Sequence, residues 1–265
     1  MPAMKMPGRS GAARLVVAVA LLLGAASTLS SCGDDDPSAT SSASADQALP
    51  PAADVEAYFA AVASYDPDRL TEALADTEPG SIAADYAGYL AALSRAAIAG
   101  GDPVPGAEIH ATADGFKACG GTGGPQDCVE WADFEGHGGK LTGFTINGES
   151  LDGRLVAGDG TNVPAGDLAG VRLAFAYQSV QSGDLFVVVD VDAAEDVTIR
   201  SEGAVYRLAD GTPVHTSRYV GPTGTPADTQ ATVVLVFPQV AVGGRVDLDL
   251  VTADQRSETV ELTTG

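Results

Sequence analysis

The sequence predicts a small α+β domain over residues 51–148 and an all-β sandwich over residues 151–265. Apolar residues recur at helical spacing between Pro51 and Gly101, and the period falls to about two after that point. From Leu151 onward, short apolar stretches follow one another with turn residues between them. Helices followed by antiparallel strands are typical of an α+β domain, and a series of short strands is typical of a sandwich.

Three helices are expected at the start of the α+β domain. The first ends near Tyr65, and Asp66-Pro67 then combines an N-cap residue with a proline at the first position of a short second helix. Ser81 caps a third helix, which a glycine-proline stretch ends at residues 100–103. The apolar faces of the first and third helices contain Val55, Phe59, Val62, Ile82, Tyr86, Tyr89 and Leu93.

Three antiparallel strands are expected after the helices, over Glu108–Phe116, Cys128–Phe134 and Leu141–Ile146. Cys119 and Cys128 bracket a glycine-rich loop, whose covalent closure contributes about 2.5 to 3 kcal/mol in the chain-entropy model. A redox pair would be spaced C-x-x-C, and a zinc site would need two more ligands. The two cysteines are therefore predicted to form a structural disulfide.

The second domain contains two nearly continuous apolar runs, LFVVVDV (residues 185–191) and ATVVLVF (residues 231–237). Such runs are typical of central strands. Other stretches, such as Val246 to Leu250, alternate apolar and polar residues and are expected to have one face in water. About seven strands in about 115 residues predict an immunoglobulin-like sandwich, without the Cys…Trp…Cys pattern of true immunoglobulin domains.

The first 32 residues combine a basic start, an apolar centre and a cysteine. The apolar segment Leu15 to Ala26 would span roughly 18 Å as a helix, which is short of the ~30 Å hydrocarbon core of a membrane. Leu29-Ser30-Ser31-Cys32 resembles the lipobox of bacterial lipoproteins. The resemblance implies that residues 1–31 are a cleaved signal peptide and that Cys32 carries the lipid. The alternative is an ordinary cleaved signal peptide with a chance cysteine.

Residues 32–50 are rich in Ser, Ala, Asp and Thr and are predicted to form a disordered acidic tether. The three aspartates that follow Cys32 are repelled by an anionic leaflet, so the acyl chains are expected to hold the protein, and stable anchoring needs more than one chain. The sequence thus predicts a lipid-anchored protein on the extracytoplasmic face of the cell membrane.

The chain is strongly acidic, with a formal net charge of −22. Residues 1–31 contain three basic and no acidic residues, so their removal leaves a charge of −25. Such a polyanion is an implausible partner for nucleic acid. No cofactor is predicted, because the sequence contains neither a Walker loop nor a G-x-S-x-G motif and its three histidines lie in no recognised metal spacing.

Two further resemblances concern the folded part. The helical start and the strand GKLTGFTING (residues 139–148) are similar to an abbreviated member of the nuclear-transport-factor-2-like, or cone-shaped, family over about residues 52–148. That resemblance implies a bent sheet around a cavity. The segment SVQSGDLFVVVDV (residues 179–191) resembles extracytoplasmic β-sandwich domains of bacterial lipoproteins, which implies a location and an architecture rather than an activity.

A cavity in the first domain is a candidate site, with Tyr86, His110 and Glu130 in its lining. His110 could pair across the sheet with Glu130 or Asp133, and such a pair is able to do general acid–base work. Tyr58, Tyr86 and Tyr89 could line the same cavity. The alternative is a surface histidine beside acidic neighbours, with the tyrosines in the core.

A cluster of carboxylates at a strand end is a calcium candidate, although it lacks the residue order of a known calcium loop. Its members are Asp190, Asp192, Glu195 and Asp196. The alternative is solvated carboxylates in an acidic protein, and no metal site is predicted.

These patterns favour a non-enzymatic lipoprotein that binds or scaffolds an unknown protein or ligand of the cell envelope. The alternatives are a small-molecule-binding or enzymatic cone-shaped domain and a calcium-dependent adhesion module.

Overall fold

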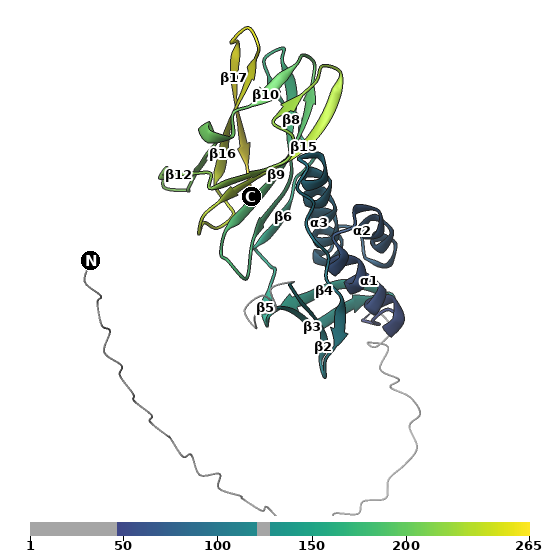
Figure 1. The fold of residues 1–265 in the computed structure, drawn as a ribbon. Helices are drawn as coiled ribbons and strands as arrows, with labels where there is room; N and C mark the ends of the chain where they lie inside the picture. Colours follow the sequence, from purple (N-terminus) through teal and green to yellow (C-terminus); the bar gives the residue numbers. More distant parts are fainter. Residues whose placement is uncertain (1–46, 121–127) are drawn as a thin grey trace, which may run out of the picture. The chain divides into compact units, whose positions relative to one another are not determined.

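The computed structural model describes residues 47–120 and 128–265, which contain three α-helices and three antiparallel β-sheets (Figure 1). These residues belong to one compact unit, Ser41–Gly265. None of the helices described is both long enough and apolar enough to cross a membrane. The predicted signal peptide, Cys32 and nearly all of the predicted tether lie outside the described residues.

The helices form where the sequence predicts them, and both predicted caps are present. The Asp66 carboxylate accepts hydrogen bonds from the backbone N–H groups of Asp68 and Arg69 at 2.9 and 3.3 Å. The Ser81 hydroxyl accepts one from the N–H of Ala84 at 3.3 Å. The helical elements are α1 (Ala52–Ser64), α2 (Pro67–Ala73), the 3₁₀ turn η1 (Leu74–Asp76) and α3 (Ile82–Ala99).

The first sheet has the strand order β1-β2-β3-β4-β5. Where the sequence predicts one strand over Glu108–Phe116, the structure has a tight hairpin, in which the N–H of Thr112 donates to the carbonyl of Gly115 at 2.9 Å. A disulfide bond joins Cys119 to Cys128, which face each other across β2 and β3. The strands are β1 (Ile109–Ala111), β2 (Gly115–Cys119), β3 (Cys128–His137), β4 (Lys140–Ile146) and β5 (Glu149–Ser150).

The second sheet has the order β13-β15-β9-β8-β6, with β7 beside β8, and the third has the order β12-β11-β16-β10-β14, with β17 beside β16. The second sheet consists of β6 (Leu155–Ala157), β7 (Val163–Ala165), β8 (Ala169–Gln178), β9 (Leu185–Ala193), β13 (Arg218–Val220) and β15 (Thr229–Phe237). The third consists of β10 (Val197–Ile199), β11 (Val205–Arg207), β12 (Pro213–His215), β14 (Gly224–Thr225), β16 (Arg245–Thr252) and β17 (Ser257–Thr263), with the 3₁₀ turn η3 (Ser201–Gly203) before β11.

The second and third sheets form a β-sandwich around one hydrophobic core. Successive residues of a strand point to opposite faces, so alternate residues of the central strands enter this core. From the second sheet it receives Val171, Val187, Val189, Val233, Leu235 and Phe237, and from the third Tyr206, Val246, Leu248, Leu250, Val260 and Leu262.

The opposite face of the second sheet is covered by α3. Val188 and Val234 lie on that face, are fully buried and share a core with Tyr89 and Leu90 of the helix. Central strands buried on both faces explain the continuous apolar runs, because neither face needs polar residues. Farther along β9, the same face bears the half-buried Asp190.

The predicted fold class, an α+β domain followed by an immunoglobulin-like sandwich, is therefore wrong. The chain is mainly β, and its helices do not form a small domain of their own, because α3 packs both on the first sheet and on the second. One core joins Phe59 and Phe144 to Tyr177 and Val188. Helical and strand periods indicate which residues are buried, but they do not indicate which elements are buried against each other.

Candidate functional site

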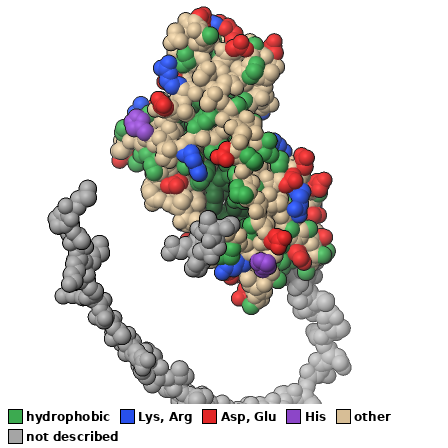
Figure 2. All heavy atoms as spheres, in the orientation of Figure 1, with side chains coloured by type: hydrophobic (Ala, Val, Ile, Leu, Met, Phe, Trp, Pro, Cys, Tyr) green, Lys and Arg blue, Asp and Glu red, His purple; other side chains and the backbone are tan. Residues whose placement is uncertain are grey.

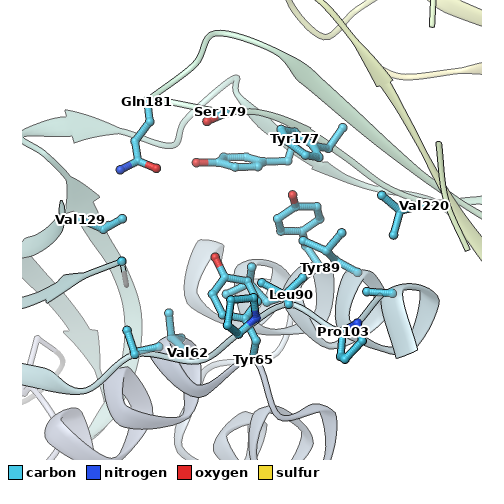
Figure 3. A pocket seen from close by; sticks show the side chains of 18 of the residues that line it. Val62, Tyr65, Tyr89, Leu90, Pro103, Val129, Tyr177, Ser179, Gln181 and Val220 are labelled. Atoms are coloured by element: carbon cyan, nitrogen blue, oxygen red, sulfur yellow. The ribbon is translucent and has the colours of Figure 1, made fainter. Parts of the chain in front are cut away.

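A cavity of about 600 Å³ lies where the helices and the first sheet meet the second sheet. Its lining comes from α1, α3 and the segment 100–107, from β2, β3 and β4, and from β8, β9 and β13 (Figure 3). Figure 2 shows a hollow with hydrophobic side chains in its depth. Sites for small molecules and cofactors are typically clefts of about 300 to 1,000 Å³ with mainly apolar walls.

Five tyrosines line this cavity: Tyr65, Tyr86, Tyr89, Tyr177 and Tyr219. We call the first four the tyrosine cluster; the hydroxyl of the fifth, Tyr219, donates a hydrogen bond to the carbonyl of Pro222. Tyr86 and Tyr89 lie on one face of α3, and their ring centroids are 5.7 and 4.9 Å from that of Tyr177 on β8. Tyr65 is the C-cap residue of α1, in the left-handed conformation with φ 50°. The cluster therefore exists only because the helices and the second sheet share a core.

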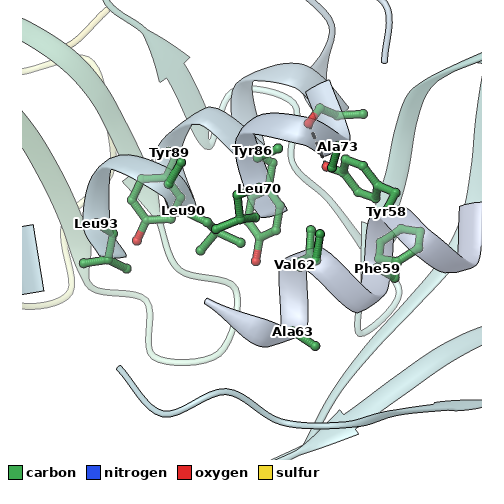
Figure 4. Close-up of a cluster of buried hydrophobic side chains, with 14 of the residues drawn as sticks. Tyr58, Phe59, Val62, Ala63, Leu70, Ala73, Tyr86, Tyr89, Leu90 and Leu93 are labelled. Carbon is green, nitrogen blue, oxygen red and sulfur yellow. Dashed lines mark hydrogen bonds between the residues drawn. The ribbon is translucent and has the colours of Figure 1, made fainter. Parts of the chain in front are cut away.

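The hydroxyl groups of the cluster are poorly satisfied within the protein. Among the described residues, those of Tyr65, Tyr86 and Tyr89 have no hydrogen-bond partner, and that of Tyr177 accepts a long bond from the N–H of Val180 at 3.4 Å. By contrast, the buried hydroxyl of Tyr58 donates to the carbonyl of Ala83 at 2.7 Å (Figure 4). The hydroxyls of Tyr65, Tyr86 and Tyr89 therefore have unused hydrogen-bonding capacity, which water or a ligand in the cavity is able to take up.

Burial keeps these phenols neutral. It raises the pKa of Tyr65, and it raises the pKa of both Tyr86 and Tyr89 well above the ordinary value, with a smaller contribution from the neighbouring phenols to these two. Burial also raises the pKa of Tyr177 to about 12. At neutral pH each hydroxyl is therefore able to donate a hydrogen bond or to accept one.

Polar side chains lie among the apolar walls. Arg218, on the edge strand β13, places its guanidinium carbon 5.8 Å from the centroid of the Phe186 ring. Gln181 donates a hydrogen bond to the carbonyl of Cys128 at 3.2 Å. The indole N–H of Trp131 is buried and has no partner within the described residues. Asp102 and Arg218 are the charged residues in the part of the lining that the structure describes.

The structure brings together only some of the predicted site residues. Tyr86 and Tyr89 line the cavity, whereas Tyr58 is in the core behind it. His110 and Glu130 are exposed on the first sheet, with Lys117 of β2 between them in the strand register, and neither lines the cavity. An acid–base pair inside a cone therefore does not form.

Sequence reasoning missed Tyr65, Tyr177 and Arg218 as site residues. Tyr177 and Arg218 belong to strands whose outer face is covered by α3, and no sequence pattern indicates that contact. Tyr65 comes directly after the last residue of α1, whose apolar face is visible in the sequence. This position next to a buried helix end is the signal that could have identified Tyr65 as a site residue.

The four calcium candidates do not gather around one point. Asp190 forms an ion pair with Arg172 at 3.1 Å, and Glu195 pairs with Arg256. Asp196 accepts a hydrogen bond from the N–H of Ala227 at 2.8 Å. Within the described ranges, no three His, Cys, Asp or Glu side chains are placed to hold a metal ion.

A comparison of the sequence with protein-family models and with curated proteins found no match. Cys119 in the wall of the cavity is held in a disulfide, and the lining that is described includes no histidine. Neutral hydroxyls and one guanidinium in a mainly apolar wall are groups that are able to bind the polar atoms of a small molecule.

Proposed function

We propose that the protein is a lipid-anchored, extracytoplasmic binding protein of the cell envelope whose ligand is a small molecule with an apolar body. The observation that carries the proposal is the tyrosine cluster, which lines a cavity of about 600 Å³ and in which three of the four hydroxyls have no partner among the described residues. In this proposal the rings surround the ligand and the hydroxyls bind its polar atoms.

The hydroxyl oxygens of Tyr65, Tyr86 and Tyr89 are not among the fully buried polar atoms without a partner, so they reach the open space of the cavity and are able to bond to what fills it. Tyr86 and Tyr89 are 6% and 2% exposed, so water reaches them poorly except through the cavity. Four such residues from three separate segments converge on one space, which favours a ligand as their partner.

The location is proposed from the N-terminal sequence. The lipobox-like Leu29-Ser30-Ser31-Cys32, preceded by an apolar segment, supports acylation of Cys32. The acidic residues after Cys32 would hold the folded part away from an anionic membrane, so the cavity would face the envelope rather than the lipid.

The binding function is tested with N-phenyl-1-naphthylamine, a neutral probe that fluoresces in apolar sites. Wild-type protein should bind it, and Val129→Trp, which fills part of the cavity, should lower the affinity about tenfold or more, because the probe and the indole compete for one space. Val214→Trp on β12, outside the cavity lining, is the matched control and should bind like wild type. Circular dichroism checks that both variants fold. Equal binding by Val129→Trp and wild type would show that the cavity is not the site.

The proposed anchor is tested in cells with Cys32→Ala. The variant should leave the membrane fraction, because no acyl chain would be attached. If it still sediments with membranes after a high-salt wash, the lipid is not the anchor. This result would leave the cavity argument unchanged.

A further inference from the structure

The described lining of the cavity combines phenol hydroxyls, which are able to donate a hydrogen bond, with one guanidinium, that of Arg218. We propose that the ligand is an amphipathic anion: Arg218 binds its carboxylate, sulfonate or phosphate group, and the tyrosine cluster surrounds its apolar body. This inference rests on the proposed binding function and adds the chemical class of the ligand.

Arg218 is free to take an anionic partner. Asp and Glu outnumber Lys and Arg by 36 to 14 in this chain, and Arg154, Arg172, Arg207, Arg245 and Arg256 each lie within 4.0 Å of a carboxylate. Among the described residues, Arg69, Arg95, Arg200 and Arg218 have no such carboxylate, and of these four Arg218 is the one that lines the cavity. A guanidinium presents its N–H groups in a planar fork that matches carboxylates and phosphates.

The position of Arg218 is set by the fold. Arg218 faces Val236 in the pairing of β13 with β15, and its guanidinium lies over the half-buried ring of Phe186 on β9. Stacking on an aromatic ring restricts the side chain, so less conformational freedom is lost when an anion binds. Phe186 lies 6.4 Å from Tyr89, ring centre to ring centre, and this contact places the charge beside the tyrosine cluster.

The electrostatic environment of the cluster also favours an anion. The charged side chains that act on these phenols are Arg218, which lowers the pKa of Tyr89, and Arg154, which lowers that of Tyr177, both against the larger effect of burial. Asp102 lines the cavity as well, but it is exposed and is not among the groups that shift the pKa of any tyrosine in the cluster. Arg218 is thus the described charged side chain that acts on Tyr89.

The test compares two probes that share one body. 1-Anilinonaphthalene-8-sulfonate is N-phenyl-1-naphthylamine with an added sulfonate, so the ratio of their affinities isolates the effect of the charge. Wild-type protein should bind the sulfonate more tightly. Arg218→Gln should weaken the sulfonate about three- to tenfold, since the pair is partly exposed, and should change the neutral probe less than twofold. Arg200→Gln removes the same charge at an exposed position outside the cavity lining and should change neither.

The outcomes separate the two proposals. If wild type binds the neutral probe as tightly as the sulfonate or more tightly, or if Arg218→Gln weakens the sulfonate no more than Arg200→Gln does, the anion inference is wrong and the binding cavity stands. If wild type binds neither probe, or if Val129→Trp binds both as wild type does, the binding function itself is wrong.

Discussion

The clearest test of the cavity compares two tyrosine-to-phenylalanine substitutions in one core. Tyr58 and Tyr86 are 1% and 6% exposed, and each ring contacts Phe144. Tyr58→Phe and Tyr86→Phe each remove one oxygen atom and keep the ring. The two differ in what that oxygen does in the folded protein.

The expected effects on stability follow from the hydrogen bonds. Tyr58→Phe loses a buried hydrogen bond of 2.7 Å to the carbonyl of Ala83 and should lower the free energy of unfolding by about 1 to 1.5 kcal/mol. Tyr86→Phe loses no hydrogen bond within the described residues, so its free energy of unfolding should stay within about 0.5 kcal/mol of wild type. For a chain of this size, about 1 kcal/mol moves the thermal midpoint by about 2 to 4 °C.

Urea denaturation followed by the fluorescence of Trp131 measures both variants. Trp131 is the one tryptophan of the chain, and it is buried beside Phe59 in the same core. If Tyr86→Phe is destabilised as much as Tyr58→Phe, the Tyr86 hydroxyl has a structural partner, and the argument that it awaits a ligand is refuted.

Two further predictions concern the disulfide and the phenols. Replacing Cys119 and Cys128 together by alanine should lower the free energy of unfolding by about 2.5 kcal/mol, because the loop between them is no longer closed in the unfolded chain; a reductant should then destabilise the wild type but not the variant in urea denaturation. Burial raises the pKa of Tyr177 from 10.0 to about 12, so the unfolded state loses this proton first. The free energy of unfolding should therefore fall as pH rises from about 10 to 12. Ultraviolet absorbance should show that the phenols of the native protein ionise at higher pH than those of the unfolded chain. Unchanged stability over this range would contradict the raised pKa of Tyr177.

Local features of the fold are readable from the sequence because they depend on neighbouring residues. Asp66 and Ser81 cap helices through atoms two or three residues away. The β1–β2 hairpin was missed although Asp114-Gly115 is a turn signal. A Cβ atom at Gly115 would lie 1.9 Å from the carbonyl oxygen of Trp131, so this position admits only glycine. That constraint comes from the neighbouring strand β3, so the residues directly around Gly115 do not reveal it.

The candidate site depends on contacts between distant segments, and this is why it was predicted only in part. The spacing of Tyr86 and Tyr89 places them on one face of α3, which local reasoning captures. Their meeting with Tyr177 and Arg218 depends on which surface of the second sheet α3 covers. Apolar residues on both faces of β9 and β15 indicate that something covers each face, but they do not identify the cover. His110 was predicted as a site residue because an imidazole is able to act as an acid or a base. The structure places it on strand β1 with its side chain exposed.

The packing of α3 between two sheets makes the beginning and the end of the folded chain dependent on each other. Val62 and Val220 border the same cavity although more than a hundred positions separate them. A ligand bound in this cavity would contact the helical part and the sandwich part of the chain at the same time. Its binding free energy would therefore add to the free energy of unfolding of the whole compact unit. Heating a saturated sample should then give a single, later melting transition, in which neither part comes apart ahead of the other.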